Sequence, residues 1–180
     1  VIGCKIPFNH RSQFLFNSKI NGLDETDCLL IVGSNVREEA PIINARIRKQ
    51  VISRDLPVAL IGENFDLTYK YEHLGNDVNI LTDILYDKNE FSKKLLEAKK
   101  PMLIVGQSLL NRDDSIQIYS LLESFIEKFN MANDEWNGFN VLQLSASRAG
   151  SLEVGCYQKN KNLDDIMDDA RNNKVRLVMS

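Results

Sequence analysis

Five short apolar runs constrain the fold of this chain more than any other feature. Each is continuous or nearly so, and each is rich in leucine, isoleucine and valine. Strands that are buried on both faces of a parallel sheet show this pattern, whereas strands with one wet face alternate apolar and polar residues. The sequence therefore predicts strands at 28–32, 58–61, 102–105, 139–144 and 175–179.

Helical spacing of apolar residues separates these runs. Ile43, Ile47 and Val51 recur at every fourth position after Pro41, and proline is favoured in the first turn of a helix. Strand–helix alternation predicts an α/β fold with a parallel, doubly wound (Rossmann-like) sheet, covered by helices on both faces in three layers. The same helical spacing occurs over 80–96, 118–129 and 163–170.

The organisation between these elements has two further features. Residues 62–79 are polar and aromatic and residues 145–162 are rich in glycine and serine, so both stretches are predicted to be long loops, which often carry function. The strings LLIVGSN and MLIVGQS resemble each other. We therefore predict two related halves, at about 27–100 and 101–180.

The charge of the chain argues against nucleic acid as a partner. The 180 residues carry a net charge of −3 with a pI near 5.5, and nucleic-acid binding needs a basic face. A single basic turn is not such a face, and we expect it to be the solvated end of a helix. This local cluster consists of Arg46, Arg48, Lys49 and Arg54.

The cysteines exclude several classes of site. Cys4, Cys28 and Cys156 are odd in number and far apart, which argues against a disulfide framework, a redox pair or a local zinc or iron–sulfur motif. Cys28 opens an apolar run and is expected to be buried. No apolar run approaches the roughly 20 residues of a membrane span, so no direct membrane insertion is expected.

Three glycines follow predicted strands. Gly33, Gly62 and Gly106 should share one rim, because the carboxyl ends of parallel strands meet at one edge of a sheet, where ligands usually bind. None of the three turns is a GxGxxG or GxxxxGK[ST] phosphate motif. Each glycine alone is therefore expected to serve a tight turn.

No catalytic residue is predicted from the serines and histidines. Ser145 and Ser147 follow a strand, but LSASRAG is not a GxSxG nucleophile motif. His10 and His73 are the only histidines, and an isolated loop histidine more often has a structural role.

The acidic residues and the single tryptophan are also expected to be structural. Asp66, Glu72 and Asp77 could form an acidic pair or a metal site, but they lack metal-ligand spacing and solvated carboxylates are expected. The aspartates within 163–170 lie at helical spacing and predict a solvated face. Trp136 precedes a turn into a strand and is expected to anchor it.

Four longer strings carry a resemblance to a known family. They are EEAPIINARIRK (38–49), IGENFDLTYKYEHLG (61–75), KKPMLIVGQ (99–107) and WNGFNVLQLSASRAG (136–150). In this order and spacing they resemble the C-terminal region of the large iron–sulfur subunit of NADH:quinone oxidoreductase (complex I), known in bacteria as the G subunit. The resemblance implies that residues 1–180 form part of one molybdopterin-oxidoreductase-like domain, as in formate dehydrogenases and dimethyl sulfoxide reductases.

The resemblance also bears on the turn after the first predicted strand. In those enzymes a Gly-x-Asn-Pro turn helps to hold the nucleotide of a molybdopterin cofactor, whereas this chain has Val36 in place of the proline, followed by acids. It implies a vestigial nucleotide turn at Gly33, Ser34 and Asn35, with rim glycines Gly62 and Gly106 and no bound cofactor. Asn35 is expected to make structural turn hydrogen bonds. The alternative is an oxidoreductase domain that still binds a molybdopterin or dinucleotide cofactor.

The family context extends beyond this sequence. The chain begins at Val1 and ends in a strand-like run, so we expect a piece of a longer polypeptide. The resemblance implies 2Fe–2S and 4Fe–4S clusters in an N-terminal part of the subunit, and partners among those cluster domains and other peripheral-arm subunits. It implies a location on the cytoplasmic face of the bacterial inner membrane or the mitochondrial matrix side. A free-standing ligand-binding or regulatory module is the third possibility.

Overall fold

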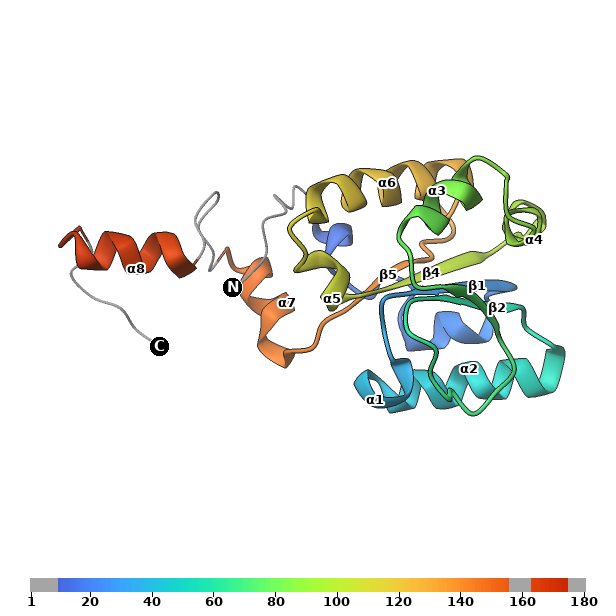
Figure 1. Ribbon diagram of the computed structural model, residues 1–180. Coiled ribbons are helices and arrows are strands. Elements are labelled where there is room, and N and C mark those ends of the chain that lie inside the picture. The colour runs from blue at the N-terminus through green and yellow to red at the C-terminus, as the bar shows by residue number, and fades with distance from the viewer. Residues whose placement is uncertain (1–9, 156–162, 175–180) are drawn as a thin grey trace.

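A parallel sheet forms the centre of the molecule (Figure 1). The computed structural model describes residues 10–155 and 163–174. Within them, five strands lie in the order β3-β2-β1-β4-β5, and every neighbouring pair is parallel. The predicted doubly wound α/β fold is confirmed. The strands are β1 (Cys28–Val32), β2 (Val58–Ile61), β3 (Glu72–Gly75), β4 (Pro101–Gly106) and β5 (Phe139–Leu142).

Helices cover both faces of this sheet. Leu29 and Ile31 of β1 pack in one apolar cluster with Ile47, while Leu30 packs on the other face with Leu122. The first face carries α1 (Val36–Glu39) and α2 (Pro41–Arg54), at the bottom of Figure 1. The second face carries α3 (Asn79–Leu85), α4 (Phe91–Glu97), α5 (Gln107–Leu110) and α6 (Ser115–Lys128).

Short helices stand at the two ends of the described chain. The 3-10 helices η1 (Arg11–Gln13) and η2 (Ile20–Asp24) precede β1, and α7 (Ala146–Glu153) and α8 (Leu163–Arg171) follow β5. Residues between η1 and η2 cover the outer edge of β5, because the Val141 N–H donates to the Leu15 carbonyl at 3.0 Å. In the part of the chain that the structure describes, no helix has the length and apolarity needed to cross a membrane.

Two predicted loops contain regular structure. Strand β3 lies inside the predicted loop 62–79, and helix α7 lies inside the predicted loop 145–162. Glu72 and His73 of β3 are exposed, so this edge strand has no continuous apolar run. The buried residues of α7 are Arg148 and Leu152, too few to produce apolar periodicity.

Some predicted bounds also change. The helical pattern over 80–96 is two helices, because α3 ends before Asp87, which has a positive φ of 59°. Strand β5 ends at Leu142, two residues before the predicted end. The predicted helix at 163–170 is α8, whereas the strand predicted at 175–179 lies outside the described residues.

The two predicted halves share an order of elements. A strand, a four-residue helix, a 14-residue helix and a four-residue strand occur twice, as β1–α1–α2–β2 and as β4–α5–α6–β5. Strands β1 and β4 are neighbours, and their register pairs Leu29 with Met102 and Val32 with Val105, as the similar strings align. This agreement supports the duplication, which stays a prediction.

Candidate functional site

The carboxyl ends of the strands bring the three predicted glycines to one rim. Gly33 follows β1, Gly62 follows β2 and Gly106 ends β4. The Gly33 N–H donates to the Ile61 carbonyl at 2.9 Å, and the Gly62 N–H donates to the Gly75 carbonyl at 2.8 Å. The chain order reverses between β1 and β4, which makes the ends of these two strands the switch point where open α/β sheets usually bind ligands.

Close packing fills this switch point. A Cβ added to Gly106 would lie 2.0 Å from the Gly33 carbonyl oxygen, so only glycine fits there. The Ser108 hydroxyl donates to the same oxygen at 2.6 Å. A Cβ on Gly33 would meet the Leu109 side chain at 3.3 Å, and Gly33 itself has a φ of +64°, which glycine tolerates best. The backbone of Gly106 and side chains of α5 therefore lie against the turn after β1.

A carboxylate from α1 folds back onto that turn. The Ser34 hydroxyl donates to Glu39 Oε2 at 2.7 Å, and the Asn35 backbone N–H donates to Glu39 Oε1 at 3.1 Å. A hydroxyl and a backbone N–H after a strand are the donors that a bound phosphate would use. In this chain both donors already have an internal anion, and Ser34 is buried under it.

The side chain of Asn35 departs from the prediction. Its Oδ1 is buried and has no hydrogen-bond partner in the described parts of the chain. The side-chain oxygen of Asn35 therefore makes no turn bond with the described residues, and the turn bonds of Asn35 come from its backbone, whose N–H donates to Glu39 and whose carbonyl accepts the N–H groups of Glu38 and Glu39. An unpaired buried acceptor costs roughly 1–3 kcal/mol. It is also an atom to which a donor on a ligand could bind.

The carboxylates of the predicted loop 62–79 lie in separate contacts. Asp66 bonds Arg37 at 2.7 Å, and its pKa is lowered first by the N–H of Thr68 and then by Arg37. Glu72 pairs with Lys94 at 2.9 Å. The Asp77 carboxylate accepts the Asn79 N–H at 2.9 Å.

These acids do not converge with the other possible metal ligands. His73 Nε2 lies 2.7 Å from the Gly62 carbonyl oxygen, so the ring contacts the rim glycine. Among residues 10–155 and 163–174, no three histidine, cysteine, aspartate or glutamate side chains are placed to hold a metal ion together.

The remaining candidates are dispersed. His10 is exposed before η1, and Ser145 and Ser147 are exposed at the start of α7. Cys28 is buried as predicted, and burial raises the pKa of its thiol to about 12. Cys4 and Cys156 lie outside the described residues.

The basic turn of α2 is less solvated than predicted. Arg46 pairs with Asp24 at 2.6 Å, and Arg54 donates to the Thr26 carbonyl at 2.9 Å. Arg48 donates to the Thr68 carbonyl at 3.2 Å, and Lys49 is exposed on the same turn.

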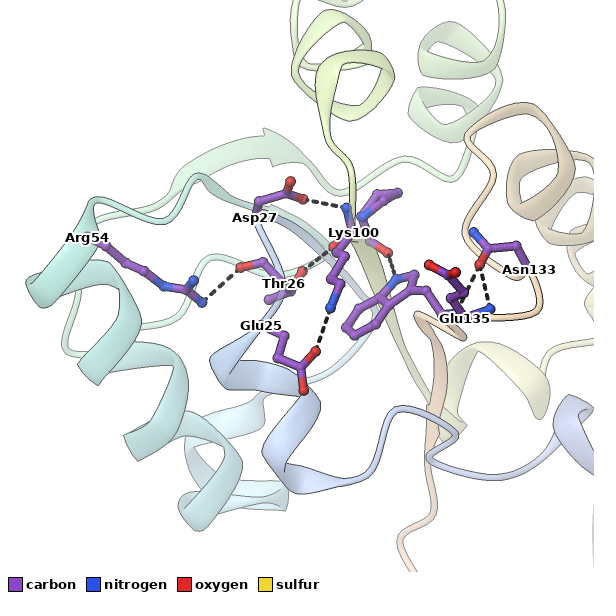
Figure 2. A network of polar contacts seen from close by, with 9 residues as sticks. Glu25, Thr26, Asp27, Arg54, Lys100, Asn133 and Glu135 are labelled. Atoms are coloured by element: carbon purple, nitrogen blue, oxygen red, sulfur yellow. Dashed lines mark hydrogen bonds and ion pairs between the residues drawn. The ribbon is translucent and has the colours of Figure 1, made fainter.

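A polar network closes the opposite, amino-terminal end of the sheet (Figure 2). Thr26 is buried just before β1, and its hydroxyl donates to the Lys100 carbonyl at 2.7 Å. The Asp27 carboxylate accepts the backbone N–H groups of Lys99 and Lys100 at 2.7 and 2.9 Å. Lys100 extends to Glu25 at 2.5 Å. These bonds join the starts of β1 and β4.

Trp136 completes this end of the sheet. Its indole N–H donates to the Pro101 carbonyl at 2.8 Å, and Lys100 Nζ lies 5.4 Å from the centre of its ring. The Asn133 side-chain oxygen accepts the backbone N–H of Trp136 at 2.9 Å. Trp136 is 7% exposed, so it is the anchor that the sequence predicted.

Comparison with known proteins shows which family has this sequence and fold. Residues 5–179 match the model of the molybdopterin oxidoreductase family. The chain is 41% identical over 151 residues to the G subunit of NADH-quinone oxidoreductase from Rickettsia typhi, which covers 84% of this chain and 22% of that protein. It is 44% identical over 147 residues to the mitochondrial NADH-ubiquinone oxidoreductase 78 kDa subunit of Neurospora crassa, covering 81% and 20%.

A third relative agrees with the other two. The G subunit of the Rickettsia bellii enzyme is 38% identical over 162 residues, covering 90% of this chain and 24% of that protein. The resemblance read from the four strings is thus confirmed, and the chain spans about a fifth to a quarter of the length of these relatives. The chain belongs to the molybdopterin oxidoreductase family.

Proposed function

We propose that this chain is a cofactor-free structural domain of the peripheral arm of NADH:quinone oxidoreductase. The observation that supports this most is the carboxylate of Glu39, which takes the Ser34 hydroxyl and the Asn35 N–H at the turn after β1. The identity of the enzyme in this proposal comes from the names of the relatives. In this proposal the domain supports NADH-to-quinone electron transfer without taking part in it.

The residues at the rim do not fit a cofactor diphosphate. A phosphate at the turn would compete with Glu39 for both donors and would lie beside its charge. Two like charges about 4 Å apart repel by roughly 1 kcal/mol in water and about 4 kcal/mol near a protein surface. The contact between Gly33 and Gly106 further closes the switch point that a nucleotide would enter.

One observation favours the alternative, an oxidoreductase domain that still binds a molybdopterin or dinucleotide. Asn35 Oδ1 is a buried acceptor without a partner in the described residues. A ligand N–H or O–H group would satisfy it. The two functions therefore differ over which group occupies the turn, Glu39 or a ligand.

The rest of the proposed function concerns the longer polypeptide. Iron–sulfur clusters, 2Fe–2S and 4Fe–4S, would lie in its other parts and carry the electrons. This domain would brace those cluster domains and present surfaces to other peripheral-arm subunits. The assembly would face the bacterial cytoplasm at the inner membrane, or the mitochondrial matrix. The names of the relatives, as subunits of NADH-quinone and NADH-ubiquinone oxidoreductases, support the assembly with other subunits.

Analysis of released cofactors tests the proposal. The complex containing the full-length polypeptide is purified, denatured in acid, and assayed for pterin fluorescence, for nucleotides by mass spectrometry and for molybdenum. We expect no stoichiometric pterin or molybdenum. One equivalent of either, lost in a variant that alters the rim and keeps the fold such as Asn35→Ala, would establish the alternative instead.

A further inference from the structure

The segment that precedes η2 lies along the outer edge of β5. The Leu15 carbonyl accepts the Val141 N–H at 3.0 Å, and Phe16 forms an isolated antiparallel bridge with Asn140. Strand β5 pairs with β4 on its other side, so these contacts lie on the edge that would otherwise be free. We call residues 12–18 the edge strap.

Two asparagine side chains fix the edge strap to β5. The Asn17 amide donates to the Phe139 carbonyl at 2.6 Å and to the Ser12 carbonyl at 2.7 Å. The Asn140 side-chain oxygen accepts the Ser18 N–H at 2.9 Å and the Ser18 hydroxyl at 3.1 Å, and Asn140 is fully buried. Side-chain amides thus make hydrogen bonds that the backbone of a neighbouring strand would otherwise make.

The edge strap is not a sixth strand of the sheet. Phe14 packs in the apolar cluster on the α6 face, whereas Phe16 packs against the cluster on the α2 face. Residues two apart share one face of a regular strand, so the backbone turns around the edge here and does not extend the sheet. A strand that paired with β5 would have to displace side chains from both faces.

The two edges of the sheet differ in their need for a cover. Strand β3, at the other edge, has exposed residues, among them Glu72, which pairs with Lys94 at 2.9 Å. Short edge strands with charged side chains resist pairing with another strand. All four residues of β5 are buried, so this strand has no such protection of its own. An apolar edge of this kind must be covered by another segment.

We propose that the edge strap ends the sheet at β5 by excluding any further strand from this edge. Strands β4 and β5 follow one another toward the edge, so the next strand of a doubly wound chain would add beside β5. The edge strap occupies that position. Further strands of the longer polypeptide therefore belong to a separate sheet, and a second copy cannot pair with β5. This inference is independent of the proposed function, because it does not involve the rim.

Hydrogen exchange in the full-length polypeptide tests the role of the edge strap. Asn17→Asp keeps the shape of the side chain but directs a carboxylate at the Phe139 and Ser12 carbonyls, so the strap should detach. We expect the Val141 N–H to exchange at least tenfold faster than in wild type. The Leu103 N–H, which bonds across β4 and β5, should exchange as before.

Asn133→Asp is the matched control for the added charge. The Asn133 side-chain oxygen accepts the backbone N–H groups of Glu135 and Trp136, and a carboxylate can keep both bonds. The exchange of Val141 should therefore match that of wild type in this control. Equal exchange of Val141 in wild type and Asn17→Asp would overturn the proposal, because β5 would then be protected without the bonds of the edge strap.

Self-association gives a second readout. With the strap detached, the apolar edge of β5 is open, so sedimentation should show dimers of Asn17→Asp at a protein concentration at least tenfold lower than for wild type or Asn133→Asp. Val141 should regain its protection as these dimers form. Faster exchange of Val141 without any added association would show that the strap does not exclude strands. If Asn17→Asp fails to fold, Gln143→Glu takes its place, because Gln143 donates to the Phe14 carbonyl at the other end of the strap, at 2.9 Å.

Discussion

The two ends of the sheet are built in different ways. At the amino-terminal end, the buried hydroxyl of Thr26 and the indole N–H of Trp136 both bond backbone carbonyls at the start of β4. At the carboxyl-terminal rim, Asn35 Oδ1 is buried without a partner in the described residues, and Glu39 supplies the anion for the turn. At one end the side chains bond the strand starts directly, whereas at the other a buried acceptor has no partner in the described residues.

This difference indicates which end can change function at low cost in stability. The amino-terminal bonds connect β1 to β4, so their loss should affect the whole domain. The bonds that Glu39 makes at the rim are local, since Glu39 lies five residues from Ser34 in the chain. A rim can therefore exchange a bound ligand for an internal side chain while the sheet stays intact, which is the change that we propose for this family member.

The largest expected effects come from one glycine at each end. In Gly106→Ala the new Cβ would lie 2.0 Å from the Gly33 carbonyl oxygen, and in Gly138→Ala it would lie 2.1 Å from the Pro101 carbonyl oxygen. Both contacts are with backbone, so each variant should lose about 3 kcal/mol or more, or fail to fold. Chemical denaturation measures the loss.

Gly150→Ala is the control for both glycines. It lies in α7, where an added Cβ would meet no atom of the described residues within 4 Å apart from its own helix and chain neighbours, and should gain roughly 0.5–1 kcal/mol from better helix propensity. If Gly106→Ala were as stable as the wild type, the rim would be looser than the packing described above and could open for a ligand.

Removal of one polar side chain at each end of the sheet should lower the free energy of unfolding by different amounts. Thr26→Val removes a buried hydroxyl that donates to the Lys100 carbonyl and leaves that oxygen with only the longer bond from the Asp27 N–H at 3.4 Å, which should cost roughly 0.5–1.5 kcal/mol. Asn35→Ala removes an oxygen that has no partner in the described residues, so the loss should stay below about 0.5 kcal/mol. Equal losses in urea unfolding would show that Asn35 is bonded after all.

Alkaline pH should weaken the amino-terminal end. Burial raises the pKa of Cys28, at the start of β1, from 9.0 to about 12. The unfolded chain therefore loses the thiol proton first, so the contribution of Cys28 is complete below pH 9.0 and disappears as the pH rises toward 12. The stability difference between wild type and Cys28→Ala should shrink over this window. A constant difference would contradict the burial of the thiol.

Low pH should destabilise the contact between Asp66 and Arg37 near the rim, and this is the smallest of the expected effects on stability. The Thr68 N–H and then Arg37 lower the pKa of Asp66 below 3.8. The carboxylate is thus favoured in the folded chain, so its contribution is present above pH 3.8 and is lost as the pH falls through the lowered pKa. Asp66 is exposed, so Asp66→Asn should differ only slightly from wild type near neutral pH. The NMR titration of the Asp66 carboxyl measures the shift directly, and a midpoint at or above 3.8 would exclude it.

The sequence could predict strands whose burial is complete. Strands β1, β2, β4 and β5 are buried at every position, and this produces the continuous apolar runs that were recognised. Strand β3 is an edge strand with exposed residues. It pairs with β2, but it has no apolar run from which a strand could be predicted. Helix α7 was missed because Arg148 and Leu152 are its buried residues.

The position of the rim could be predicted from the sequence, but the hydrogen bonds that its side chains make could not. The three glycines were placed correctly, because parallel strands fix where their ends lie. The hydrogen bond from Ser108 to Gly33 joins residues 75 positions apart, so no local sequence pattern predicts it. The sequence places the acid Glu39 near the turn. Its hydrogen bonds with Ser34 and Asn35 depend on the backbone path through α1. The unpaired oxygen of Asn35 likewise follows from packing.

The most direct test of the central claim is a calorimetric titration of the full-length polypeptide with inorganic pyrophosphate, in wild type and in Glu39→Gln. If Glu39 fills the turn, the wild type should show no saturable binding up to about 1 mM, whereas Glu39→Gln, which keeps the shape and removes the charge, should bind measurably. Saturable binding by the wild type with a micromolar Kd would contradict the account, because the turn would then still hold a diphosphate beside its own carboxylate.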